Sequence, residues 1–338
     1  MTDNNLYGPL DDPAGSAGYS EHPARVGFFT DTSVCIGCKA CEVACKEWNL
    51  VPDDGFNLLG MSFDNTGMLG ASTWRHVAFI EQARPLGHQD PGVADLPTGP
   101  PGSEHSAEVV ASQIEATRRG GGELGTTPAD LGMPKFERPG ERTGAEARTA
   151  FRWLMSSDVC KHCTHAGCVD VCPTGALFHT EFGTVVVQSD ICNGCGYCVS
   201  GCPYGVIDRR EGDGRAWKCT LCYDRLRDGL EPACAKACPT DSIQFGPLDE
   251  LRERAARRVE ELHGRGVPEA RLYGHDPNDG VGGDGAFFLL LDEPEVYGLP
   301  PDPVVPTRDA PSMWKYAGIA ASAFVAAAVS AFIERGRR

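Results

Sequence analysis

Cysteine is the residue type in this chain that is best suited to chemistry, and its spacing is regular. All 16 cysteines of the 338-residue sequence fall into four runs of four, with none left over. The runs are Cys35-x2-Cys38-x2-Cys41-x3-Cys45; Cys160-x2-Cys163-x4-Cys168-x3-Cys172-Pro173; Cys192-x2-Cys195-x2-Cys198-x3-Cys202-Pro203; and Cys219-x2-Cys222-x11-Cys234-x3-Cys238-Pro239. Thiolates are soft ligands, so this grouping predicts sites for iron–sulfur clusters or for zinc.

The spacing favours [4Fe–4S] clusters over the other chemistry that cysteine supports. A C-x2-C-x2-C loop supplies three ligands to one cluster, and a fourth cysteine just before proline binds the other cluster of a two-cluster module. The third run, which ends at Cys202-Pro203, matches this bacterial ferredoxin pattern at every position. Structural zinc needs only separated C-x2-C pairs, often mixed with histidine, and disulfide frameworks belong to small secreted scaffolds. We therefore expect four [4Fe–4S] clusters and a role in electron transfer.

Exchange of the fourth cysteine between partner runs predicts which residues bind each cluster. The second and third runs lie only 19 residues apart and should form one module, which leaves the first and fourth runs to form the other. The four predicted ligand sets are Cys160, Cys163, Cys168 and Cys202; Cys192, Cys195, Cys198 and Cys172; Cys35, Cys38, Cys41 and Cys238; and Cys219, Cys222, Cys234 and Cys45.

Other polar residues near the cysteines are expected to support the clusters. His162, His165 and His179 should be hydrogen-bonding neighbours, since cysteine already fills every ligand position. Lys161 and Lys218 stand inside cluster loops, where each is either a cation that raises the cluster's potential or a solvated lysine. No nucleophile or acid–base constellation is recognisable, so we expect no catalytic residue and a non-catalytic subunit of an oxidoreductase.

The charge of the chain restricts its partners. The formal net charge is −16, and four clusters with their thiolates bring it to roughly −24. Such a protein is a poor ligand for nucleic acid or for an anionic lipid surface, and it suits a redox partner with a basic face. Residues 1–13 have neither a basic region nor an apolar run, so we expect no signal peptide and folding in the cytosol.

Composition divides the chain into six segments, and the fold class that we expect is α+β with two duplicated two-cluster ferredoxin modules. The duplication is indicated by the repeated cysteine runs and by the short apolar stretch after three of the prolines. The segments are an N-terminal extension (1–24), the first cluster-binding run (25–82), a Gly/Pro-rich insertion (83–148), the second to fourth runs (149–246), a C-terminal extension (247–311) and a transmembrane helix (312–334). We expect the insertion to lie on a partner subunit.

Four shorter elements are expected from periodicity. Residues 73–80 and 286–291 are apolar and β-prone, and they predict strands. Residues 107–117 are faintly helical. Residues 248–263 repeat Leu and Val at helical spacing, which predicts an amphipathic helix packed on the cluster domain.

The C-terminus predicts one membrane span. Residues 317–333 carry no charge and follow Trp314 and Tyr316, two residues typical of membrane interfaces. The alternative is a buried helix of a soluble protein. Eight alanines among these 17 residues favour close packing on other membrane helices. The arginines after the span predict a cytoplasmic C-terminus and a cluster domain on the outer face of the cell membrane.

The chain resembles the iron–sulfur β subunit of membrane-bound respiratory formate dehydrogenase. The resemblance lies in residues 29–49, which end in Cys45-Lys-Glu-Trp-Asn49, and in residues 217–225, 281–283 and 297–300, followed by the C-terminal span. It covers most of the chain outside the insertion and the N-terminal extension. Nitrate reductase partners replace one cluster cysteine by tryptophan, whereas all sixteen are present here.

The resemblance implies a relay between two other subunits. Electrons from formate would pass from a molybdenum- or tungsten-pterin catalytic subunit, through the four clusters, to a membrane cytochrome b or quinone-reactive subunit. Export of the folded complex by a signal on the catalytic subunit would agree with the missing signal peptide. Two alternatives stay open: the equivalent subunit of a membrane-bound hydrogenase or other molybdopterin oxidoreductase, and a membrane-tethered scaffold whose clusters are structural.

Overall fold

The computed structural model describes residues 12–55, 63–64, 66–82 and 152–336. The insertion predicted over 83–148 and its faint helix at 107–117 lie outside the described residues. The chain divides into two compact units, one of residues 1–80 with 154–338 and one of residues 81–153. The described helices and strands belong to the first unit, apart from the ends of two strands at the boundary.

A four-stranded mixed sheet forms the centre of the first unit. Its strand order is β8 (Ile243–Pro247), β1 (Val26–Asp31), β10 (Ala286–Leu290) and β9 (Arg271–Tyr273). Strand β1 pairs in parallel with β10 and antiparallel with β8, which brings residues from both ends of the sequence together. Every residue of β10 is buried, as expected for an apolar strand that is covered on both faces. The strand predicted over 286–291 is therefore confirmed.

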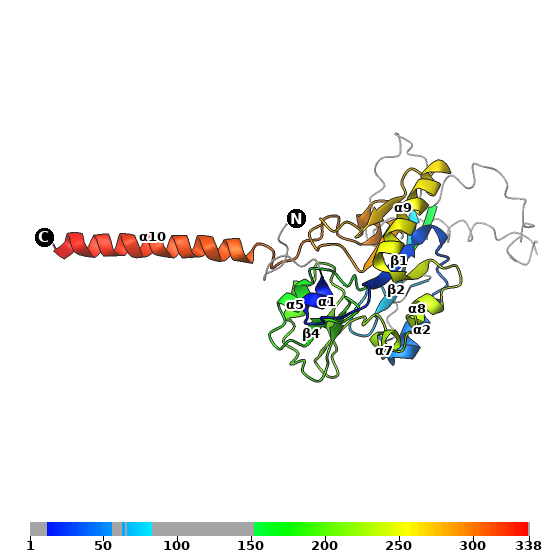
Figure 1. Ribbon diagram of the computed structural model, residues 1–338, viewed down its shortest axis with the longest axis horizontal. Coiled ribbons are helices and arrows are strands. Elements are labelled where there is room, and N and C mark those ends of the chain that lie inside the picture. Colours follow the sequence, from blue (N-terminus) through cyan, green and yellow to red (C-terminus); the bar gives the residue numbers. More distant parts are fainter. Residues whose placement is uncertain (1–11, 56–62, 65, 83–151, 337–338) are drawn as a thin grey trace, which may run out of the picture. The chain divides into compact units, whose positions relative to one another are not determined.

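Helix α9 (Leu248–Gly264) packs on this sheet against β1, β8 and β9 (Figure 1). Its buried side chains are Leu248, Leu251, Ala255 and Leu262, which recur at helical spacing, so the predicted amphipathic helix is confirmed. On β1 and β10, the rings of Phe29 and Phe287 stack with centroids 5.3 Å apart. This apolar packing stabilises the sheet.

The cysteine runs lie in short elements around this sheet. Each run is a loop followed by a short helix that carries its third cysteine, because successive ligands must turn around one small site. The helices are α2 (Ala40–Asn49), α5 (Gly167–Asp170), α6 (Tyr197–Gly201) and α8 (Ala233–Lys236), with α7 (Tyr223–Arg227) between the second and third cysteines of the fourth run. Two hairpins separate the runs: β4 (Leu177–His179) with β5 (Val185–Val187), and β6 (Asp208–Arg209) with β7 (Ala216–Trp217).

The remaining short elements are α1 (Pro13–Ser16), η1 (Thr32–Val34) and η3 (Pro294–Tyr297). Strands β2 (Arg75–Gln82) and β3 (Arg152–Val159) form a two-stranded sheet. Strand β2 starts two residues later than the predicted strand at residue 73. Thr73 instead closes a tight turn by bridging to Gly70, and its hydroxyl donates to Asp54 at 2.7 Å.

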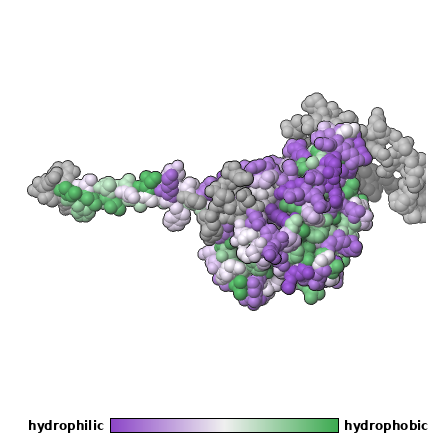
Figure 2. Space-filling view, viewed as in Figure 1, coloured by the Kyte–Doolittle hydropathy of each residue, from purple (hydrophilic) through white to green (hydrophobic). Residues whose placement is uncertain are grey.

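Helix α10 (Ala310–Gly336) forms the C-terminal end of the described chain. Its window Ser312–Ser330 is long and apolar enough to cross a membrane, and none of that window is buried. Large apolar side chains such as Trp314, Phe324 and Phe332 are exposed, and Figure 2 shows this helix largely in hydrophobic colours. The helix is confirmed, and the membrane span stays a prediction.

Candidate iron–sulfur cluster sites

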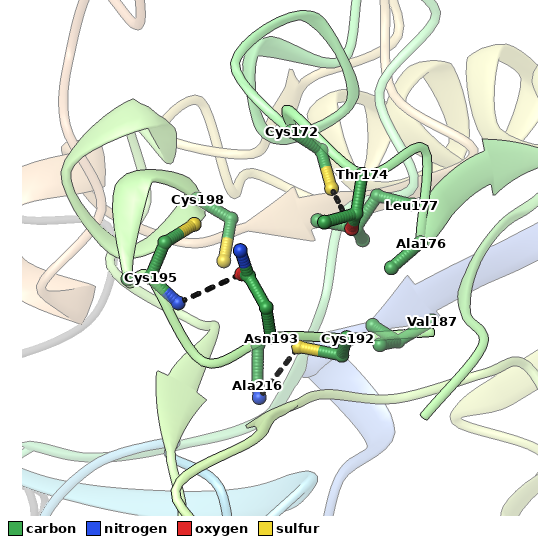
Figure 3. Close-up of a pocket in the computed structure, with 11 residues that line it drawn as sticks. Cys172, Thr174, Ala176, Leu177, Val187, Cys192, Asn193, Cys195, Cys198 and Ala216 are labelled. Atoms are coloured by element: carbon green, nitrogen blue, oxygen red, sulfur yellow. Dashed lines mark hydrogen bonds between the residues drawn. The ribbon is translucent and has the colours of Figure 1, made fainter. Parts of the chain in front are cut away.

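Four cysteines from two runs line one cavity. Cys192, Cys195 and Cys198 come from the third run, whereas Cys172 enters from the end of the second run (Figure 3). The Ala216 N–H donates to Cys192 Sγ at 3.4 Å. The structure thus brings together one complete predicted ligand set, with its fourth member exchanged between runs.

The electrostatics of this cavity suit a cationic core. Burial, together with the neighbouring Cys172, Cys192 and Cys195, raises the pKa of the Cys198 thiol to about 11. Burial also opposes ionisation of Cys172, but hydrogen bonds from the backbone around Leu177 and from Thr174 lower its pKa below the usual value. Four thiolates this close repel each other unless cations lie between them, and the iron ions of a cluster would supply that charge.

A second cavity is lined by the other predicted set of the same module. Its cysteines are Cys160, Cys163 and Cys168 from the second run and Cys202 from the third. Burial raises the pKa of Cys163 and Cys168 above the ordinary thiol value. Both cavities therefore show the same exchange of the fourth cysteine.

Two lysines at the second cavity are fully buried. Lys161 and Lys218 line it and are each 1% exposed, so the solvated alternative for these lysines is wrong. Lys218 Nζ donates to the carbonyl oxygen of Val185 at 2.5 Å and to that of Cys219 at 2.9 Å. Lys161 Nζ donates to Asp158 and, at 3.0 Å, to the carbonyl oxygen of Val159. These ammonium groups place positive charge where an anionic cluster would bind.

His162, His165 and His179 are buried, and the pKa values of His162 and His179 are lowered. Burial lowers the pKa of His162 well below its usual value and lowers that of His179 to about 3. His162 Nδ1 accepts a hydrogen bond from the Val185 N–H at 3.1 Å, which supports the loop at the second cavity. The structure thus places His162 as a hydrogen-bonding neighbour, as the sequence predicted.

The first and fourth runs also meet, since helices α2 and α8 pack against each other. Burial raises the pKa of Cys45, and the neighbouring thiols of Cys219, Cys234 and Cys222 also raise it. These four residues are a third predicted set. Burial also raises the pKa of Cys35, with Cys238 and Cys38 among the groups that affect it.

Cys41 belongs to the predicted set with Cys35, Cys38 and Cys238, and it lies near the set that contains Cys45. Burial raises the pKa of its thiol to about 11, and Cys234, from the neighbouring set, is among the groups that raise it. The two sets of this pair of runs therefore adjoin each other through Cys41 and Cys234.

Three residues around these sulfurs were not found from the sequence. Asn49 Nδ2 lies 3.6 Å from Cys222 Sγ and 3.8 Å from Cys45 Sγ. Ser157 Oγ lies 3.2 Å from Cys41 Sγ, and Arg75 Nη1 donates to that hydroxyl at 3.2 Å. Arg75 stands in an ordinary strand pattern far from any cysteine run, and Ser157 precedes the second run but contacts Cys41 of the first run, so no sequence signal marks either contact.

An aromatic contact joins the first run to the fourth. Trp48 Nε1 donates to Asp224 Oδ2 at 2.8 Å, and the guanidinium carbon of Arg225 lies 4.2 Å from the centre of the indole ring. These contacts link α2 to α7 and give the tryptophan that follows Cys45 a structural role.

The donor sets fit clusters and not single ions. Among the residues that the structure describes, no three His, Cys, Asp or Glu side chains converge on a point where one metal ion could bind. In a [4Fe–4S] cluster each of four thiolates binds a different iron, so the sulfurs surround a cage. The two cavities lined by four cysteines have this arrangement, which defines an iron–sulfur protein of the ferredoxin type.

Comparisons with known proteins agree with this class. A family model described as a 4Fe-4S dicluster domain matches residues 151–248, and one described as a 4Fe-4S binding domain matches residues 32–48. The nitrate-inducible formate dehydrogenase iron–sulfur subunit of Escherichia coli K12 is 34% identical over 90% of this chain and 83% of its own length. The formate dehydrogenase iron–sulfur subunit of Haemophilus influenzae is 34% identical over 84% of this chain and 72% of its own.

A more distant relative is the B subunit of the anaerobic dimethyl sulfoxide reductase of Escherichia coli K12, which is 29% identical over 68% of this chain and 77% of its own length. The similarity to the formate dehydrogenase subunits is higher and covers more of the chain. The chain belongs to the family of formate dehydrogenase iron–sulfur subunits, as its sequence motifs predicted. It is an electron-transfer subunit with a mixed α and β structure and [4Fe–4S] ferredoxin domains.

Proposed function

We propose that this chain holds four [4Fe–4S] clusters in two duplicated ferredoxin modules and conducts electrons from formate toward quinone. The observation that carries the proposal is the exchange of Cys172 and Cys202 between two cavities that are each lined by four cysteines. Such exchange is the pattern of a two-cluster ferredoxin module. The meeting of Cys45 with the fourth run supports the same pattern for the second module.

The four sites would form a linear series. Cysteines of neighbouring sets affect each other's pKa values. Cys198 raises the pKa of Cys168, which belongs to the second-run set, and Cys160 of the second-run set raises the pKa of Cys219. Cys234, of the set with Cys219, lies near Cys41. A series of neighbouring clusters suits a conductor of electrons, with the first-run site at one end and the third-run site at the other.

The two ends of this series would face different subunits. One partner is a molybdenum- or tungsten-pterin subunit that oxidises formate, and the other is a membrane cytochrome b or quinone-reactive subunit. Helix α10, with its apolar and exposed window Ser312–Ser330, would cross the cell membrane once beside that second partner. The cluster domain would lie on the outer face with the C-terminus in the cytoplasm, and the insertion 83–148 would contact a partner.

The test is reduction of the clusters in the native complex. The complex is solubilised gently under anaerobic conditions through an N-terminal tag, and its reduced-cluster EPR signals are recorded after addition of formate and, separately, of hydrogen. Reduction by formate, with molybdenum or tungsten co-purifying, is expected. Reduction by hydrogen alone, with nickel present, would instead assign the chain to a hydrogenase. Full iron content with signals that neither donor changes would support the structural scaffold.

A further inference from the structure

A buried arginine lies near cysteines of both predicted cluster sites of the first and fourth runs. Arg75, the first residue of β2, is 1% exposed. Its Nη1 donates to the carbonyl and to the hydroxyl oxygen of Ser157, each at 3.2 Å. Within the described residues, its Nε and Nη2 have no hydrogen-bond partner. A guanidinium that is always charged and only partly satisfied requires negative charge nearby.

The negative charge available to Arg75 comes from cysteines of both predicted sets. Although burial favours its neutral form, the thiolates of Cys234, Cys41, Cys219 and Cys45, named in order of their effect, raise the pKa of Arg75 above its usual value. In the loaded protein these sulfurs would belong to two clusters that carry about −2 each. The cation is therefore placed to interact with both.

The position of the guanidinium is held on its other side. Its central carbon lies 4.8 Å from the centre of the Phe28 ring, and Phe28 is fully buried. This cation–π contact keeps the charge dry and prevents water from screening it. A fixed charge in a dry site acts more strongly than a solvated lysine at the surface.

Ser157 extends the effect to one particular sulfur. Its hydroxyl oxygen accepts from Arg75 Nη1 and lies 3.2 Å from Cys41 Sγ. Because the oxygen accepts from the cation, its own hydrogen is available to the sulfur of Cys41. Hydrogen bonds in such a chain polarise one another, so the donor to Cys41 is strengthened by the charge behind it.

We propose that Arg75 is a positioning residue that raises the reduction potentials of the two clusters held by the first and fourth runs. The inference rests on the proposed function, since it requires clusters at those sites. Reduction adds one electron to a cluster and forms or breaks no bond, and Arg75 stays charged throughout. Its fixed positive charge stabilises the reduced, more negative state of both clusters, and Ser157 adds to this at the cluster that contains Cys41.

The test is a potentiometric EPR titration of the full chain, purified anaerobically, with iron content measured on the same samples. Wild-type protein without clusters at the first and fourth runs would contradict the proposed function itself. With clusters present, Arg75→Gln should make two of the four clusters at least tenfold harder to reduce at a fixed potential, which is a fall of about 59 mV for one electron. Ser157→Ala should shift one of these two clusters, and by less.

Two further variants separate the effect of this buried charge from changes in net charge and in cluster loading. Arg271→Gln removes an arginine that pairs with Glu293 at the surface, so it controls for net charge, and it should leave all potentials unchanged. Arg75→Lys keeps the charge and should bind all its clusters. At a fixed potential, the reduction of each of the two clusters should stay within about threefold of that in wild type. The inference is wrong if fully loaded Arg75→Gln titrates like wild type or shifts the potentials of all four clusters equally. It is also wrong if the two clusters of fully loaded Arg75→Lys become tenfold or more harder to reduce at a fixed potential. If Arg75→Gln does not bind its clusters, the inference is judged on the potentials of Arg75→Lys and Ser157→Ala: it is wrong if Ser157→Ala leaves the potentials unchanged or if Arg75→Lys shifts them as stated above.

Discussion

Asn49 is expected to raise the reduction potential of the cluster bound by the set that contains Cys45 and Cys222. One hydrogen of its Nδ2 group is used by the carbonyl oxygen of Cys45 at 2.9 Å. The second is left for the two sulfurs, at 3.6 Å from Cys222 Sγ and 3.8 Å from Cys45 Sγ. Because a thiolate becomes more negative when its cluster is reduced, an N–H donor stabilises the reduced state more than the oxidised state.

The magnitude follows from the geometry. A hydrogen bond to a charged group contributes about 1.5–3 kcal/mol, and the shared, long contacts to sulfur place this one at the low end. Only the difference between the oxidised and reduced states counts, which we take as about 0.5–1 kcal/mol, or about 20–45 mV for one electron. Asn49→Leu, which keeps the approximate shape and removes the donor, should lower this potential by that amount.

The assay is an anaerobic EPR titration of the full chain, with iron content as a check on loading. Trp48→Phe is the matched control, because Trp48 stands next to Asn49 on α2 but donates to Asp224 and contacts Arg225. That variant should shift the potential by less than about 10 mV. A fully loaded Asn49→Leu protein with an unchanged potential would show that the amide does not act on the sulfurs.

The other predictions concern loading, anchoring and stability. Cys198→Ser should lose or damage one cluster, about four iron atoms per chain at most, and stop formate-to-quinone electron flow; unchanged flow would refute the relay. Truncation after Pro311 should release the chain or its complex from the membrane fraction, and retention would contradict the span. Anaerobic iron chelation should abolish hydrogen-exchange protection in β4 and β5, whose core holds few large apolar residues, and spare β1 and β10; equal loss in both would refute this. Gly282→Ala should destabilise the fold by several kcal/mol in chemical denaturation, since its φ is +75° and a Cβ would lie 2.0 Å from His165 Cδ2; an unchanged midpoint would exclude that clash.

The chemistry of the sites could be predicted from the sequence because it depends on local spacing. Successive cysteines of one run must turn around one small cluster, so C-x2-C-x2-C is visible within eleven residues such as Cys35–Cys45. Helix α9 and strand β10 could also be predicted from local sequence, since each follows from the pattern of its own apolar residues. The later start of β2 was not predictable, because the turn at Thr73 depends on its hydrogen bond to Asp54.

By itself, the sequence determined the cluster chemistry, the family and the apolar C-terminal helix. Only the tertiary structure decided what surrounds the sulfurs. Strand β1 reaches its parallel partner β10 across most of the chain, and the same folding places Arg75 and Ser157 beside Cys41. Spacing along the chain carries no information on such neighbours, because their distance in sequence is bridged by sheet pairing and by apolar packing. The charges that tune a cluster are therefore properties of the fold, whereas the cluster's ligands are properties of the motif.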